Sequence, residues 1–351
     1  MAEPLKNSFG PTVVDRIAQN LPVDRDAFVS DCLRGFEPLS LMDRARHVAD
    51  VMHDHLDPDP ATAVTQVARS LGTDRPHGMD GFFYNPHSFF IARYGLPAFE
   101  ESMAAQYELT KLFTAEFCIR PFIVEYPQTM DTLRTWTGDP DEHVRRLVSE
   151  GTRPRLPWAT RLPQFQRDPG PVLELLDRLK DDGSEYVRRS VANNLNDIAK
   201  DNPQVALDVA GRWYEGRERL VKHALRTLLK AGDPQALAIL GYSTSSVSAH
   251  AELPHRIAIG SSLPLEVTLT GHGRVLADIV VHFVKANGST SQKVFRGAEL
   301  DVHGRATLRR TISFRQHSTR RHYPGEHRIE ALINGRRQEL GVIDVVAATT
   351  D

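Results

Sequence analysis

Apolar residues change their spacing about two thirds of the way along the chain. Over residues 4–242 they recur every three or four positions, as in Leu173, Leu176 and Leu179, which is the period of an amphipathic helix. From Pro254 onward, short β-branched segments alternate apolar and polar positions, which is the period of a half-buried strand. The pattern therefore predicts an all-α region followed by an all-β region.

The second region is predicted to be a β-sandwich, because several short strands are separated by dipeptides that favour turns. The predicted strands cover residues 265–270, 279–284, 307–314 and 327–333. The predicted turns are Asn287-Gly288, His303-Gly304, Pro324-Gly325 and Asn334-Gly335. A Ser/Thr-rich stretch, 243–248, is the expected linker, so we expect a helical-repeat domain over residues 1–245 and a β-sandwich domain over residues 250–351.

The helical region contains a repeat. The segments HVRRLVSEGTR, YVRRSVANNLN and, more loosely, LVKHALRTLLK place Val144, Val187 and Val221 at one shared position, 43 and 34 residues apart. A second pair of similar segments, YPQTMDTLRTW and NPQVALDVAGRW, ends at Trp136 and Trp213. Two-helix units of this length are typical of HEAT-like solenoids, so we expect three or more stacked helix pairs.

The longer of the two intervals contains a predicted loop, RPRLPWATRLPQF, at residues 153–165. Three prolines stiffen this loop, which also holds three arginines and Trp158. Because long loops in compact domains are often functional, we expect Trp158 and its flanking arginines to contact a ligand. The alternative is an ordinary surface connection between two helices.

Two carboxylates occupy equivalent places in neighbouring repeats. Glu116 interrupts an apolar stripe in LTKLFTAEFCIRPF, and Glu150 follows 34 residues later, one repeat length away. An Arg-Pro pair comes within five residues of each acid. Adjacent repeats are therefore expected to place the two carboxylates side by side. The alternative is that Glu116 pairs with Arg120 one helical turn away.

Basic and polar residues recur along one stripe in three successive repeats, a pattern that suits a polyanion lying across them. The alternative is an ordinary solvated helix face. The stripe comprises His143, Arg146, Glu150 and Arg153, then Arg189, Asn193 and Asn196, then His223, Thr227 and Lys230.

Charge is distributed unevenly along the 351 residues, although the net charge is only −2. Residues 254–351 hold 12 Arg and 2 Lys against 9 Asp and Glu, which gives +5, so the rest of the chain carries −7. We therefore expect the β-sandwich to clamp a polyanion, with an ordinary solvated β surface as the alternative. The outward arginines chosen for this contact are Arg309, Arg315, Arg320 and Arg321.

The sequence contains no motif for several other kinds of catalytic or binding site. The only cysteines, Cys32 and Cys118, are too few for a disulfide framework or a Cys-based zinc site. No H-E-x-x-H, G-x-S-x-G, Walker A or G-x-G-x-x-G motif is present, so neither a metal nor a cofactor is expected. The sequence also lacks a signal peptide pattern and a spanning apolar stretch, so we expect a soluble cytoplasmic protein that acts at the nucleoid.

Three runs carry a family resemblance: TAEFCIRPF, DPDEHVRRLVSEGTRPRLPWATRLP and RRSVANNLNDIAKDNP. They resemble the AlkC branch of the helical-repeat alkylpurine DNA glycosylases, and the similarity extends over nearly the whole chain. Some members of this branch carry an immunoglobulin-like domain, which the C-terminal region resembles. The resemblance implies a HEAT-like solenoid followed by an immunoglobulin-like β-sandwich.

The same resemblance implies a monomeric enzyme that hydrolyses the N-glycosidic bond of cationic alkylated bases in duplex DNA. The expected substrates are 3-methyladenine and related N-methylated bases, and the resemblance implies a reaction without base flipping and without a cofactor. A cationic base is already a good leaving group, so the enzyme mainly has to stabilise an oxocarbenium-like sugar. Carboxylates supply that stabilisation, and an aromatic face supports the cation.

On this interpretation Glu116, Glu150 and Trp158 are the catalytic residues. Asp197 is the alternative to Glu116 as the second electrostatic carboxylate. The expected DNA-binding residues are Arg120, Arg146, Arg153, Arg155, Arg161, Arg188, Arg189, Asn193, Arg309, Arg315, Arg320 and Arg321.

Two other functions remain compatible with the sequence. Helical repeats commonly serve as non-catalytic scaffolds for protein partners, and such a scaffold would not depend on Glu116 or Glu150. A DNA-lesion-binding protein that does not cut is the other alternative.

Overall fold

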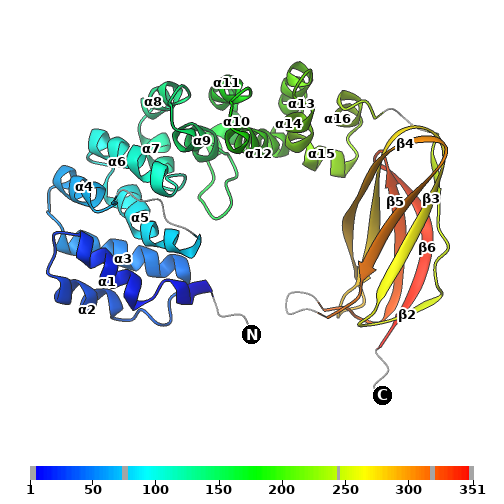
Figure 1. Cartoon of the computed structure of the whole chain (residues 1–351), viewed down its shortest axis with the longest axis horizontal. Coiled ribbons are helices and arrows are strands. Elements are labelled where there is room, and N and C mark those ends of the chain that lie inside the picture. Colours follow the sequence, from blue (N-terminus) through cyan, green and yellow to red (C-terminus); the bar gives the residue numbers. More distant parts are fainter. Residues whose placement is uncertain (1–4, 73–77, 243–245, 317–320, 348–351) are drawn as a thin grey trace. The chain divides into compact units, whose positions relative to one another are not determined.

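Helices precede strands along the chain, as the sequence pattern predicts (Figure 1). The structure is a computed structural model that describes residues 5–72, 78–242, 246–316 and 321–347. The last helix ends at Ile239 and the first strand begins at Ser248. Contacts within the chain divide it into two compact units, Met1–Asn202 and Pro203–Asp351. The predicted domain boundary at residue 245 stays a prediction.

The first unit consists of helices. They are η1 (Leu5–Ser8), α1 (Pro11–Asn20), α2 (Arg25–Leu33), α3 (Leu41–His55), α4 (Pro60–Arg69), η2 (Gly78–Tyr84), α5 (Asn85–Tyr94), α6 (Phe99–Leu112), α7 (Ile119–Glu125), α8 (Thr129–Trp136), α9 (Glu142–Gly151), α10 (Pro163–Arg167), α11 (Gly170–Leu179) and α12 (Glu185–Asp201).

Helices α9 and α12 pack against each other and position the site described below. The carboxylate of Asp141 caps the start of α9 by accepting a hydrogen bond from the backbone N–H of His143 (2.7 Å). Val144 in α9 and Val187 in α12 are fully buried at the same place in their helices. This agreement confirms the repeat at the level of individual core positions.

The described residues of the second unit form helices and then strands. The helices are α13 (Pro203–Trp213), α14 (Glu218–Ala224), α15 (Arg226–Ala231) and α16 (Pro234–Ile239). The strands are β1 (Ser248–His250), β2 (Arg256–Ala258), β3 (Ser262–Val284), β4 (Thr290–Ser313), β5 (Gly325–Ile333) and β6 (Arg336–Val346). As the repeat predicts, helix α13 ends at Trp213 just as α8 ends at Trp136.

The strands pair in the order β1-β3-β5-β6-β2, and β4 pairs with β3. All pairings are antiparallel except that of β2 with β6. Alternate side chains of β3, including Val267, Leu269, Ile279 and Val281, are fully buried in the core of this region, and Phe314 joins them. The period-2 pattern thus identified the core face over residues 263–269, whereas residues 277–281 are all buried and do not alternate.

One predicted turn is wrong. Strand β4 runs straight through His303-Gly304, and β3 joins two segments that were predicted as separate strands. Gly304 lies opposite Gly271, with φ angles of +88° and +138° that favour glycine, and the strand pairing continues through both residues. The turn at Asn334-Gly335 is confirmed, because both residues have positive φ between β5 and β6.

Candidate active site

Glu116 and Glu150 lie on either side of one guanidinium. Arg146 of α9 contacts the Oε2 atom of Glu116 at 2.7 Å and the Oε1 atom of Glu150 at 3.6 Å. Glu116 lies in the turn before α7, where the Thr114 hydroxyl also donates to its Oε2 atom (3.0 Å). The two predicted acids are therefore close together, bridged by an arginine that belongs to the predicted stripe.

The contacts continue as a chain of alternating charges. Arg153 binds Glu150 Oε1 through Nη1 (2.6 Å) and Asp197 Oδ2 through Nε (2.8 Å). Lys200 then binds Asp197 Oδ1 at 2.7 Å. Three carboxylates thus alternate with three cations, which keeps like charges apart. We call this set the ion-pair chain: Glu116, Arg146, Glu150, Arg153, Asp197 and Lys200.

Exposure differs along the ion-pair chain. The side chain of Asp197 is 0% exposed, that of Glu150 is 7% exposed and that of Glu116 is 14% exposed. The Ser190 hydroxyl donates to Glu150 Oε2 (2.6 Å), so both oxygens of Glu150 have partners. Burial acts to lower the pKa of Arg146, but attraction to Glu116 and then to Glu150 outweighs it and raises this pKa.

Helix α12 completes the site with residues that the sequence pattern mostly did not identify. The repeat predicted a stripe of Arg189, Asn193 and Asn196, but Asn196 is buried (1% exposed) and does not lie on a solvent-facing stripe. The Asn194 side-chain amide donates to the carbonyl of Ser149 in α9 (2.7 Å). Residues spaced four and three apart in α12 form the stripe that meets α9: Ser190, Asn194 and Asp197.

The predicted loop presents Trp158 to solvent. Its side chain is 86% exposed and its backbone has φ +64°, in the left-handed region that bulky residues rarely adopt. Nearby, Leu156 is buried, and Arg155 forms a paired contact with Asp201 through Nε (2.7 Å) and Nη2 (2.5 Å). The hydrogen bond from Arg155 lowers the pKa of Asp201. Leu156 and Arg155 thus fix the loop to the helical core, while Trp158 projects into solvent.

The predicted DNA-binding arginines of the first unit fall into two groups. Arg161 and Arg189 are exposed, and Arg188 and Asn193 are half-buried. Arg120, Arg146, Arg153 and Arg155 instead make internal contacts. The largest difference is Arg120, which is 1% exposed and donates to backbone carbonyls, so neither DNA contact nor the alternative pairing with Glu116 describes its position.

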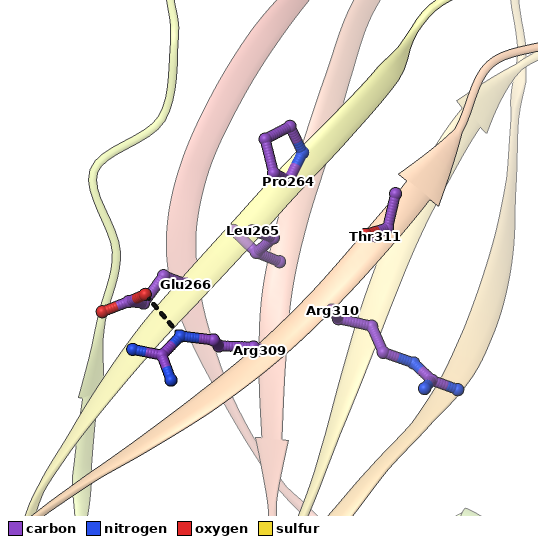
Figure 2. A pocket seen from close by; sticks show the side chains of 6 residues that line it. All are labelled: Pro264, Leu265, Glu266, Arg309, Arg310 and Thr311. Carbon is purple, nitrogen blue, oxygen red and sulfur yellow. Dashed lines mark hydrogen bonds and ion pairs between the residues drawn. The ribbon is translucent and has the colours of Figure 1, made fainter.

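In the β region, Arg309, Arg315 and Arg321 are exposed, whereas Arg320 lies outside the described residues. A shallow hollow on the β3–β4 pair contains Arg309 and Arg310, and Figure 2 shows Glu266 bound to Arg309 (2.8 Å) while Arg310 extends separately. The strand alternation did not single out Arg310, although it is exposed like Arg309. The other residues lining the hollow are Pro264, Leu265 and Thr311.

Both cysteines are buried free thiols, and burial raises the pKa of Cys32 and of Cys118 to about 12. Across residues 5–72, 78–242, 246–316 and 321–347, no group of three or more His, Cys, Asp or Glu side chains is arranged to hold a metal ion. In the same ranges no helix is both long enough and apolar enough to cross a membrane.

Two protein-family models match the sequence. Residues 113–220 match the model of the DNA alkylation repair enzymes, and this range includes Glu116, Glu150, Trp158 and Asp197. Residues 246–347 match the model of the C-terminal immunoglobulin-like domain of the uncharacterised protein YhaZ.

Two relatives match nearly the whole chain. The uncharacterised protein YhaZ of Bacillus subtilis is 39% identical over 316 residues, which covers 86% of this chain and 87% of that protein. The solved structure of the Pseudomonas fluorescens alkylpurine DNA glycosylase AlkC, bound to DNA containing an abasic site analog, is 33% identical with a TM-score of 0.86. That match covers 99% of this chain and 100% of the other.

Proposed function

Because the chain belongs to the AlkC-type alkylpurine DNA glycosylase family, we propose that it hydrolyses the N-glycosidic bond of cationic alkylated bases in duplex DNA. The proposed substrates are 3-methyladenine and related N-methylated bases. The observation that carries the proposal is the ion-pair chain beside the loop that presents Trp158.

The positive charge of the substrate base decides what this site has to supply. An N-alkylated base leaves without being protonated, so no general acid is needed. As the bond breaks, positive charge develops on the sugar, and a fixed carboxylate close to it stabilises the transition state. A site that offers an ionised carboxylate but no proton donor has little to offer a neutral base, whose departure requires a proton.

We assign the contact with the sugar to Glu116, the most exposed carboxylate of the ion-pair chain. Asp197 is fully buried and binds Arg153 and Lys200, so it acts through those cations and not by touching DNA. Glu150 holds Arg146 and Arg153 in place and adds negative potential behind Glu116. This arrangement favours Glu116 over Asp197 as the carboxylate that meets the substrate.

Trp158 is the proposed platform for the cationic base, because the face of an indole ring attracts a cation by about 0.5–2 kcal/mol. The exposed Arg161 and Arg189 are proposed to bind the flanking phosphates. The β region, with its net charge of +5, is proposed as a second contact with the DNA backbone, through Arg309, Arg315 and Arg321.

The test is the release of free base from methylated duplex DNA, separated by chromatography. We expect free 3-methyladenine, an intact sugar–phosphate backbone and no effect of a chelator. Inhibition by the chelator would contradict the cofactor-free mechanism, and direct strand cleavage would contradict simple hydrolysis. Tight binding to methylated DNA without release of base would instead favour the lesion-binding alternative.

A further inference from the structure

Arg120 lies beneath the Trp158 loop, surrounded by backbone carbonyls. Its Nη1 atom donates to the carbonyls of Gly151 (2.8 Å) and Arg153 (2.9 Å). Its Nε and Nη2 atoms both donate to the carbonyl of Thr160, at 2.9 and 2.6 Å. One guanidinium therefore binds the chain on both sides of the loop, before and after Trp158.

The segment between these carbonyls is closed on itself. The backbone N–H of Leu162 donates to the carbonyl of Pro154 (3.2 Å), and that of Ala159 donates to the carbonyl of Leu156 (3.3 Å). The last residue of α9, Gly151, also packs so tightly on Ile119 that an added Cβ would approach its Cγ2 atom to 2.6 Å. This contact brings the end of α9 within reach of Arg120, the next residue after Ile119.

The charge of Arg120 has no carboxylate within ion-pair distance among the described residues, so its direct partners are neutral carbonyls. Burial, followed by repulsion from Arg153, lowers the pKa of Arg120 to about 10, which leaves it protonated at neutral pH. A buried charge with neutral partners stabilises a fold less well than a packed apolar side chain would. What arginine offers here is the planar fork that reaches three carbonyls at once.

The backbone of Trp158 explains why such an anchor is needed. A bulky residue at φ +64° is strained, and a strained conformation persists only where the surrounding structure fixes it. Because Trp158 is 86% exposed, contacts of its own indole do little to fix this backbone conformation. The constraint therefore has to come from the base of the loop.

We propose that Arg120 is a positioning residue, which holds loop 151–162 closed so that Trp158 is presented to the damaged base in a single orientation. This inference rests on the proposed function of Trp158. The proposal can be tested because the charge of Arg120 and its forked guanidinium can be separated. Arg120→Lys keeps the positive charge but loses the fork.

The test compares Arg120→Lys with a matched control, Arg44→Lys. Arg44 is also buried (2% exposed), and it donates to the carbonyls of Lys6, Phe9 and Glu37 near the N-terminus, with one further contact to the Glu37 carboxylate (3.4 Å). Both variants remove a buried fork at constant charge, and only one of them lies under the Trp158 loop. Protein labelled with 5-fluorotryptophan gives one ¹⁹F resonance per tryptophan, and Trp158→Phe assigns that of Trp158.

In Arg120→Lys we expect the Trp158 resonance to shift or broaden, and the amides of Ala159 and Leu162 to exchange hydrogen roughly 10-fold faster or more. We expect release of methylated base at saturating DNA to slow by roughly 10- to 100-fold, because misplaced groups lose rate steeply. In a Trp158→Ala background, Arg120→Lys should cause no further loss, since the group it positions is gone. Arg44→Lys should change none of these readouts, even if it lowers Tm equally.

Additive losses in the double variant, or an unchanged Trp158 resonance, would overturn the proposal. If Arg120→Lys does not fold, the wild-type amides of Ala159 and Leu162 decide: exchange at the rate of unprotected amides rules out a closed loop. If the wild-type protein releases no base at all, the proposed function fails, whereas the fluorine and exchange measurements still decide whether Arg120 holds the loop.

Discussion

At the scale of single residues, the three acids of the site differ in the exposure of their side chains, which decreases from Glu116 to Glu150 to Asp197. Glu116 stands at one end of the ion-pair chain with one guanidinium and a threonine hydroxyl, whereas Glu150 is bound on both oxygens. Replacing Glu116, the acid at the end of the ion-pair chain, removes one ion pair. Replacing the middle acid leaves the buried Arg153 and the half-buried Arg146 without their shared partner, which is far more costly to the fold.

We therefore expect Glu116→Gln and Glu150→Gln to slow base release in single-turnover experiments by roughly 10²-fold or more, with little loss of DNA affinity. The two variants should differ in stability. Glu150→Gln should lower Tm clearly, because breaking a buried ion pair costs about 3–5 kcal/mol, whereas Glu116→Gln should lower it little. Thermal unfolding gives the second comparison, and full activity in both variants would exclude these carboxylates from the mechanism.

The closeness of Glu116 and Glu150 could be predicted because the two acids are one repeat length apart in the sequence. Stacked repeats place equivalent positions side by side. The contributions of Ser190 and Asn194 could not be predicted in the same way. Aligning the repeats identifies equivalent residues. In α12, however, the residues that contact α9 each lie one position after a residue of the predicted stripe. The internal position of Arg120 was missed because sequence patterns do not reveal which carbonyls a loop leaves unsatisfied.

At the scale of secondary-structure elements, the longest strands depend on glycine. Gly271 in β3 and Gly304 in β4 lie opposite each other at positive φ, where any side chain is strained. A Gly-containing dipeptide in a strand pattern is equally compatible with a turn and with a bend, so periodicity alone favoured a turn at His303-Gly304. The strand pairing shows instead that the ladder continues through both glycines without a shift of register.

The two glycines differ in the space around them, and this predicts different costs. A Cβ on Gly271 would lie 2.5 Å from the carbonyl oxygen of Ser246, whereas one on Gly304 would meet nothing within 4 Å. Gly304→Ala should therefore cost only backbone strain, about 1–3 kcal/mol, and Gly271→Ala should cost clearly more. Urea unfolding of both variants makes the comparison, and equal losses would show that space at Gly271 is not limiting.

At the scale of the whole molecule, charge is separated along the chain. The net charge of −2 conceals +5 in residues 254–351 and −7 in the remainder. Within the acidic part, the carboxylates of the ion-pair chain are neutralised by Arg146, Arg153 and Lys200. Acids at the site can therefore coexist with a basic β region, which we propose attracts the phosphate backbone.

If the β region grips DNA, replacing Arg315 and Arg321 together by alanine should reduce the slope of log affinity against log salt by about 0.9 for each phosphate that is no longer neutralised. Both side chains are exposed, so the double variant should fold normally. Arg25→Ala, which removes an exposed arginine of α2 from its pair with Asp15, is the matched control and should leave the slope unchanged. An unaltered slope in the double variant would remove these residues from the clamp.

If Trp158 meets the damaged base as proposed, its exposure makes the protein an optical reporter of its own encounters with DNA. Of the three tryptophans, Trp213 is buried and Trp136 is half-buried, so an aqueous quencher such as acrylamide should reach Trp158 first. A base stacked on that indole would shield it, and the quenched fraction of the emission should fall when damaged duplex is added. The recovery of quenching after dilution then times how long the enzyme stays on its product, with no label on either partner.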